Sequence, residues 1–167
     1  GKVPILWDGD CVVWDSLAII EFLADRHGKA KYWPDDEAAC GMARSMAAEM
    51  HSGFSNLRRE LPMNVRKTFP FKPLAEEVRN EIERILQLWA QARARFGSGG
   101  PFLFGEWCAA DIMYAPVVTR LITYSVPMPP FAELYMKAVL SHPDVNKWID
   151  QAQDEPWVIE QYEHEAA

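Results

Sequence analysis

From Asp35 to the end of the chain the sequence contains no convincing strand pattern, and this absence constrains the fold more than any other feature. Strand-like residues are confined to the first part of the chain, where the apolar runs 3–7 and 11–14 flank the segment Asp8-Gly9-Asp10. Asp-Gly between two apolar runs is typical of a β-hairpin, because glycine adopts positive φ without steric cost. A hairpin alone is only marginally stable. We therefore expect it to pack on a body made of helices.

The rest of the chain has helical spacing. Asp15-Ser16 opens the first helix with Ser16 as the expected N-cap, and Gly28 is the expected end. We expect five further helices, over residues 35–61, 73–96, 109–124, 131–140 and 144–153. The loop around Trp33-Pro34 reads as a linker. The pattern thus predicts an α+β protein, with a small α/β part at residues 1–30 and an all-helical part at 31–167.

Composition excludes several classes of partner. The formal net charge is -7, and no Lys/Arg cluster is long enough to follow a phosphate backbone, so we expect no nucleic acid. The acidic balance disfavours an anionic membrane surface, and no apolar run reaches membrane-spanning length. The cysteines, Cys11, Cys40 and Cys108, are odd in number and contain no CxxC spacing. We expect reduced thiols in a cytoplasmic protein, without disulfides or a metal site.

Two dipeptides form the most informative pattern, Val3-Pro4 and Asp15-Ser16. A cis bond before Pro4 would turn the backbone of Val3 outward, where a peptide ligand could bind as an added strand. Ser16 at a helix N-terminus offers a hydroxyl and the positive end of the helix dipole, which suit a carboxylate. The alternative is structural: an edge-strand proline followed by an ordinary N-cap.

Three separated segments, in the expected order, resemble the cytosolic glutathione transferases. Gly1-Lys-Val-Pro-Ile-Leu, the Asp-Gly turn and Val-Val-Trp-Asp-Ser-Leu-Ala-Ile resemble the second half of the family's thioredoxin-like domain. Phe-Gly-Glu-Trp-Cys-Ala-Ala-Asp-Ile-Met-Tyr-Ala-Pro-Val-Val, from residue 104, resembles the start of the core helix of its all-α C-terminal domain. Glu-Met-His-Ser-Gly-Phe from residue 49 and Leu-Pro-Met-Asn from residue 61 resemble a bacterial subgroup. The resemblance implies a partial thioredoxin-like domain at 1–30 and the family's helical domain at 31–167.

The resemblance also implies a glutathione site. By it, the backbone of Val3 beside a cis Pro4 would bind the cysteinyl part, Asp15 and Ser16 the γ-glutamyl end, and Lys2 the glycyl carboxylate. The family's thiol-activating Ser, Tyr or Cys lies near the start of a β-α-β unit that comes before the matched segments. The expected catalytic residue therefore lies upstream of Gly1 and is unknown.

Two further sets of residues follow from the same resemblance. One set sits on or after the long helix that lines the family's second-substrate pocket: His51, Phe54, Arg58 and Asn64. The other is a helix-capping pair, Cys108 and Asp111, in which we expect Asp111 to accept from the backbone N–H of Cys108. This second pair is expected to serve folding.

The implied function is the transfer of glutathione sulfur to a small hydrophobic electrophile, in a detoxifying homodimer with glutathione as co-substrate. Two alternatives remain open from the sequence. One is another glutathione-dependent enzyme on the same fold, such as an isomerase, dehalogenase or peroxidase. The other is a non-catalytic module for binding or dimerisation.

Overall fold

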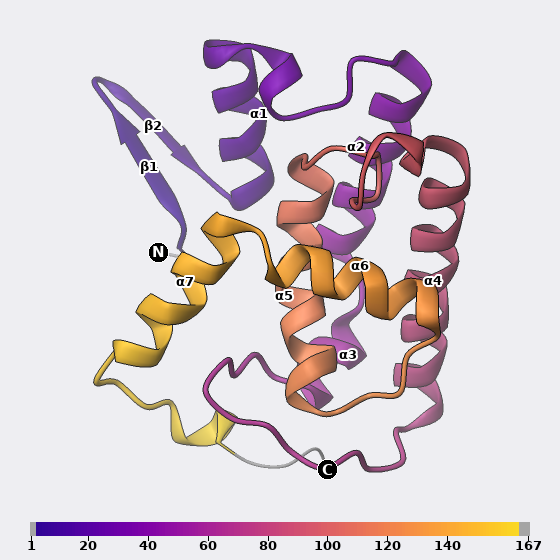
Figure 1. The fold of residues 1–167 in the computed structure, drawn as a ribbon. Helices are drawn as coiled ribbons and strands as arrows, with labels where there is room; N and C mark the ends of the chain where they lie inside the picture. The colour runs from indigo at the N-terminus through magenta and orange to yellow at the C-terminus, as the bar shows by residue number, and fades with distance from the viewer. Residues whose placement is uncertain (1–2, 164–167) are drawn as a thin grey trace.

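The computed structural model describes residues 3–163, and the expected glutathione residue Lys2 lies outside them. Strands β1 (Ile5–Asp8) and β2 (Cys11–Trp14) form an antiparallel hairpin at one edge of the molecule (Figure 1). Ile5 pairs with Trp14 and Asp8 with Cys11, so the turn consists of Gly9 and Asp10. Gly9 has φ 60°, the left-handed conformation that a tight hairpin turn requires. The predicted hairpin is confirmed.

The hairpin leads directly into helix α1 (Ser16–His27), and here the predicted N-cap is wrong by one residue. Asp15 is the cap: its Oδ1 accepts from the backbone N–H groups of Leu17 and Ala18 at 3.0 and 3.3 Å. Ser16 is instead the first helical residue. Asp and Ser are both favoured caps, and the carboxylate gains more from the positive end of the helix dipole. The helix ends at Gly28, as predicted, and a 3-10 turn (Lys29–Lys31) follows.

The helix expected over residues 35–61 is two helices, α2 (Glu37–Ser52) and α3 (Ser55–Glu60). Asp36 caps α2 through a 2.8 Å bond from the N–H of Ala39. The break falls at Gly53 and Phe54, and Phe54 adopts the left-handed conformation with φ 55°. A Cβ at Gly53 would lie 2.7 Å from the carbonyl oxygen of Glu49. Only glycine therefore fits where the chain turns out of α2.

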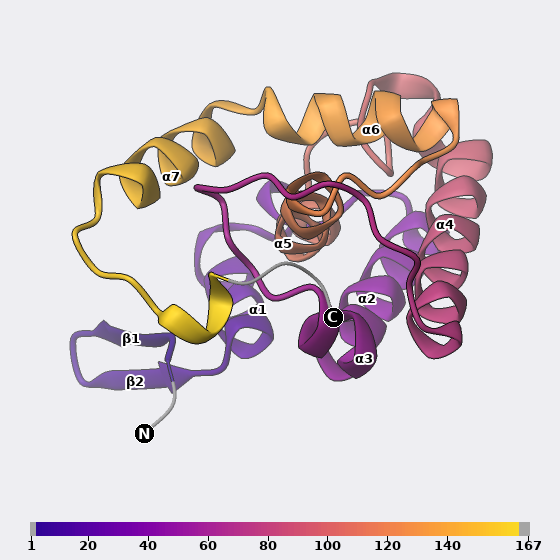
Figure 2. The ribbon, with the colours of Figure 1, turned by 90° about the horizontal axis from the view of Figure 1, so that it is seen from below.

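The remaining helices pack around α5 (Ala109–Thr123). Figure 2 looks nearly along α5 and shows α2, α4 (Glu76–Phe96) and α6 (Pro130–Leu140) around it. Most side chains of α5 are buried, which explains why its sequence is apolar on all faces. Short 3-10 turns lie at Gly97–Gly99 and Glu160–Tyr162, and α7 is Pro143–Asp154. None of the helices within residues 3–163 has the length and apolar character needed to cross a bilayer.

Asp111 lies at the start of α5 and is fully buried. Its carboxylate accepts from the backbone N–H of Cys108 at 3.0 Å, as predicted, and also from the N–H of Leu103 and the hydroxyl of Tyr135, both at 3.1 Å. Cys108 completes the capping box with a weakly accepting sulfur. The pair thus joins three segments of the helical core.

Residues 155–163, which we call the C-terminal strap, run back across the loop after α3 (yellow in Figure 1). Asn64 Nδ2 donates to the carbonyl of Tyr162 at 3.0 Å, and Arg66 donates to the carbonyls of Glu155 and Trp157. Lys67 pairs with Glu163 at 2.5 Å. The strap is therefore fastened mainly through its backbone.

Candidate functional site

Two cavities meet where the hairpin, α1 and α2 come together. The first, which we call the hairpin cavity, has a volume of about 750 Å³. One face of the hairpin supplies its apolar wall, because Ile5, Trp7, Val12 and Trp14 all lie on that face in the observed register. Its other lining residues are Val3, Pro4, Asp15, Ser16 and His51. The hairpin cavity thus contains every predicted glutathione residue that the structure describes.

The second, which we call the helix cavity, has a volume of about 430 Å³ and lies between α1, α2, α3 and α5. Its wall is largely apolar. The basic side chains on it are those of Arg58, Arg120 and His51. The apolar lining includes Ile19, Ile20, Met50, Phe54, Leu57, Met63, Ile112, Met113, Pro116 and Val117. Pro4, Ser16 and His51 line both cavities, so the two form one continuous candidate site.

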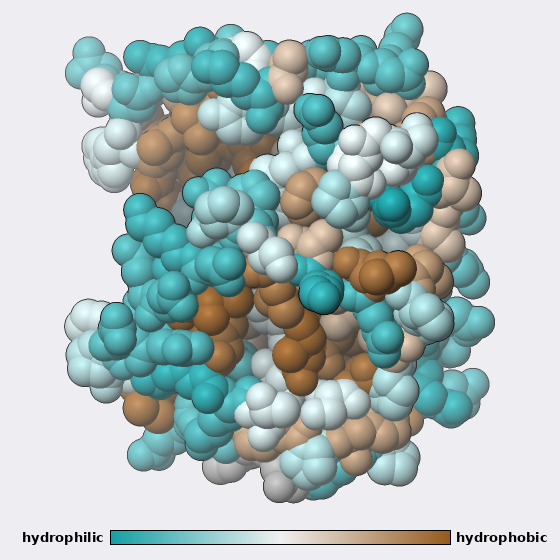
Figure 3. Space-filling model, in the orientation of Figure 1, coloured by the Kyte–Doolittle hydropathy of each residue, from teal (hydrophilic) through white to brown (hydrophobic). Residues whose placement is uncertain are grey.

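The space-filling view supports an open apolar surface in this part of the molecule. Figure 3 shows hydrophobic surface over the hairpin and α1, rimmed by hydrophilic residues, and a second hydrophobic area over α5. Trp7 and Trp14 are 73 % and 67 % exposed. Apolar surface that is open and has a polar rim is characteristic of a binding site.

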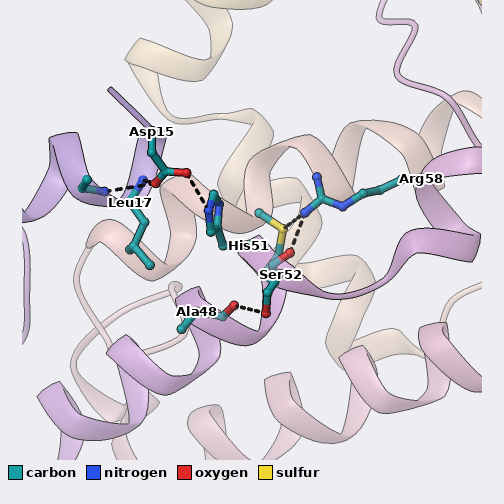
Figure 4. Close-up of polar contacts among 8 residues, drawn as sticks. Asp15, Leu17, Ala48, His51, Ser52 and Arg58 are labelled. Atoms are coloured by element: carbon teal, nitrogen blue, oxygen red, sulfur yellow. Dashed lines mark hydrogen bonds and ion pairs between the residues drawn. The ribbon is translucent and has the colours of Figure 1, made fainter. Parts of the chain in front are cut away.

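One polar contact in the site joins α2 to the start of α1. His51 Nε2 lies 2.8 Å from Asp15 Oδ2, while Asp15 Oδ1 caps α1 (Figure 4). Desolvation pushes the pKa of Asp15 upward, but the hydrogen bond from Ala18, the charge of His51 and the bond from Leu17 together lower this pKa below its ordinary value. Asp15 is therefore a carboxylate at neutral pH.

The cap changes how the start of α1 can bind a ligand. The first N–H groups of a helix have no partner within the helix, but Asp15 already occupies those of Leu17 and Ala18. Ser16, which is half-buried, makes no hydrogen bond through its hydroxyl within residues 3–163. The polar side chains that line the hairpin cavity are thus those of Asp15, Ser16 and His51, and the hydroxyl of Ser16 is without a partner among the described residues.

The structure also places the other predicted residues. The Val3–Pro4 peptide bond is cis, as predicted, and Val3 is 89 % exposed. His51, Phe54 and Arg58 line the helix cavity. Asn64 does not: it is buried, holds the C-terminal strap through Tyr162, and lies outside both cavities. Its side chain bonds to the C-terminal strap, whereas its neighbour Met63 lines the helix cavity.

Arg120 is a charged residue of the site that sequence reasoning missed. It lies on α5, and its Nη1 donates to the carbonyl of Pro116 at 3.0 Å. Its position in the sequence could have indicated it, because Arg120 is a single arginine within the apolar run of α5. Its neighbours Thr119 and Leu121 are buried. A charge at such a position requires either a partner or a ligand.

The chain is similar in sequence to proteins named glutathione S-transferase. No protein-family model matches the chain. The chain is 24 % identical over 160 residues to glutathione S-transferase GstB of Escherichia coli K12, covering 95 % of this chain and 72 % of that protein. It is 24 % identical over 104 residues to a class-mu glutathione S-transferase of Fasciola hepatica, covering 62 % of this chain and 42 % of that one.

Solved structures show the same fold. A glutathione transferase homologue from Burkholderia BGR1, solved with bound glutathione, matches with a TM-score of 0.68 and 24 % identity, over 92 % of this chain and 74 % of that one. A glutathione S-transferase from Actinobacillus pleuropneumoniae matches with a TM-score of 0.57 and 21 % identity, over 97 % and 76 %.

A two-stranded hairpin with its helix, followed by an all-helical domain around a buried capping box, defines a protein of the glutathione transferase fold. The curated relatives are named glutathione S-transferases, so the chain is similar in sequence to the family that it resembles.

Proposed function

We propose that this protein is a glutathione transferase that binds glutathione in the hairpin cavity and a small hydrophobic electrophile in the helix cavity. The observation that carries the proposal is that Pro4, Ser16 and His51 line both cavities. Two ligands that share a wall lie side by side, which is the arrangement that a bimolecular reaction needs. We also propose that the protein is a cytoplasmic homodimer, as its resemblance to the glutathione transferases implies.

The γ-glutamyl end of glutathione fits the start of α1. Its α-carboxylate would accept from the hydroxyl of Ser16, near the positive end of the helix dipole. Its α-ammonium would donate to Asp15, whose Oδ2 retains a lone pair beside the bond from His51. The backbone of Val3, which comes before the first residue of β1 and is exposed, would hold the cysteinyl part as an added strand does.

The reaction joins the glutathione sulfur to an electrophilic carbon. The thiol gives up its proton, the thiolate forms the C–S bond, and the leaving group departs with its electron pair. We assign no residue within 3–163 to activation of the thiol. Cys11 is exposed at the start of β2, where it forms part of neither cavity, and Ser16 has a binding role.

The test is the affinity for glutathione of the wild type and of Ser16→Ala, measured by calorimetry. Losing a hydrogen bond to a charged group costs about 1.5–3 kcal/mol, and we expect the lower end, roughly a tenfold weaker affinity. Ser52→Ala is the matched control, because its hydroxyl bonds to the carbonyl of Ala48 and lines neither cavity (Figure 4). Equal affinities in folded wild type and Ser16→Ala would reduce Ser16 to a structural residue.

A further inference from the structure

The helix cavity holds two arginines that no carboxylate neutralises. Within residues 3–163, no ion pair joins Arg58 or Arg120 to an acidic side chain. Asp15, the acidic residue of the candidate site, is held by His51 and lines the hairpin cavity only. The helix cavity is therefore an apolar space with net positive charge on its wall.

Arg120 is the less satisfied of the two arginines. Its Nη1 donates to Pro116, but its Nε is buried and has no partner within the described residues. Burial and, next, the charge of Arg58 lower the pKa of Arg120 to about 10, so its guanidinium remains charged at neutral pH. A buried donor without an acceptor is costly. Arg120 lines the helix cavity, so a ligand there meets its positive charge.

Arg58 approaches the same cavity from α3. Its Nε and Nη2 donate to the carbonyls of Gly53 and Met50, at the C-terminal end of helix α2. Nη2 also contacts the sulfur of Met50, and the dashed lines at Arg58 in Figure 4 mark the two contacts of Nη2. These partners are neutral, so they fix the side chain without cancelling its charge. Arg58 is thus held in place on the cavity wall as a cation.

We propose that the second substrate carries an anionic group, a carboxylate or sulfonate, on an apolar body, with Arg120 and Arg58 receiving the anion and the apolar wall receiving the body. This inference rests on the proposed function and names the substrate class of the helix cavity. A guanidinium presents a planar set of donors that matches a carboxylate, and in a cavity shielded from water this pairing is stronger than in solvent.

The test uses two probes of nearly equal shape, 1-naphthoate and 1-naphthamide, which differ in charge. Their dissociation constants are measured by fluorescence titration for the wild type, Arg120→Met, Arg120→Lys and Arg59→Met. Arg59 is the matched control: it is the neighbour of Arg58 on α3, its side chain is 66 % exposed, and it lies outside both cavities.

We expect the wild type to bind naphthoate roughly tenfold more tightly than naphthamide, the size of one hydrogen bond to a charged group. Arg120→Met should lose most of this preference, Arg120→Lys should keep part of it, and Arg59→Met should match the wild type. The inference is overturned if the wild type shows no preference, or if folded Arg120→Met keeps the full preference.

Glutathione affinity is measured on the same samples, which separates the two proposals. Arg120→Met should bind glutathione as the wild type does, because Arg120 does not line the hairpin cavity. If glutathione binds but naphthoate has no advantage, the anionic substrate class is wrong while the proposed function stands. If naphthoate has its Arg120-dependent advantage but glutathione does not bind, the proposed function fails while the anion site stands.

Discussion

His51 Nε2 and Asp15 Oδ2 lie 2.8 Å apart, so the last turn of α2 is bonded to the residue that caps α1. This contact orients the carboxylate oxygen proposed to bind the α-ammonium of glutathione. We expect His51→Ala to weaken glutathione binding by roughly two- to tenfold, the effect of one partly exposed hydrogen bond. Calorimetry measures the change.

A conservative variant separates positioning from loss of packing. His51→Gln keeps a donor near the position of Nε2 and should restore most of the affinity. An unchanged or tighter affinity in His51→Ala would show that His51 does not position Asp15 for the ligand.

Removing the carboxylate of Asp111 should destabilise the helical domain. Asp111→Ala leaves the N–H groups of Leu103 and Cys108 and the hydroxyl of Tyr135 without their acceptor. We expect a loss of about 3–5 kcal/mol in the free energy of unfolding, since each buried unsatisfied group costs about 1–3 kcal/mol. Urea denaturation measures it. Asp144→Ala, at an exposed acid on α7, should stay within about 0.5 kcal/mol of the wild type.

The protonation of Asp111 should appear in the pH dependence of stability. Burial raises the pKa of Asp111 from 3.8 to about 6, against the hydrogen bonds from Leu103 and Cys108, which lower it. The folded state therefore binds this proton more tightly than the unfolded chain does. The stabilisation is fully present below the unfolded pKa and is lost as the pH rises through about 6.

The measurement compares the unfolding free energy of the wild type with that of Asp111→Asn, which does not titrate at this position. Relative to Asp111→Asn, the unfolding free energy of the wild type should fall by on the order of 2–3 kcal/mol between pH 4 and pH 7. A difference that stays constant over this range would mean that Asp111 is ionised in both states.

Asn64 should matter for the C-terminal strap and not for ligands. Asn64→Ala removes the bonds to Tyr162 and Glu163 and the acceptor for the N–H of Arg66. We expect a loss of about 1–2 kcal/mol in stability and faster proteolysis within residues 155–163, with glutathione affinity unchanged. Asn56→Ala, whose partners lie on α3 and α4, is the control that should leave strap proteolysis as in the wild type. Weaker binding of 1-naphthoate by folded Asn64→Ala would return Asn64 to the second-substrate set.

Local patterns in the sequence predicted much of the fold. The Asp-Gly turn located the hairpin, and Gly28 located the end of α1. Each of these features depends on residues close together in the chain, whose conformational preferences can be read without knowing the tertiary structure. The Val3–Pro4 bond was predicted from the resemblance together with the local sequence.

The sequence did not predict features that depend on contacts between distant residues or on two residues with similar conformational preferences. Asp15 and Ser16 are both good caps, and the sequence alone did not show which would cap α1. Gly53 reads as tolerable within a helix, but the turn into α3 needs it. The pairing of His51 with Asp15, the exclusion of Asn64 from the cavities and the inclusion of Arg120 all depend on how separate helices pack.

The shared wall of Pro4, Ser16 and His51 has a thermodynamic consequence for the two cavities. A ligand that moves any of these residues in one cavity alters the shape of the other. The affinity for each ligand will then differ between the free protein and the protein that already holds the other ligand. The factor by which it differs must be the same for both ligands. The first ligand to bind therefore selects among candidates for the second, whichever cavity it enters.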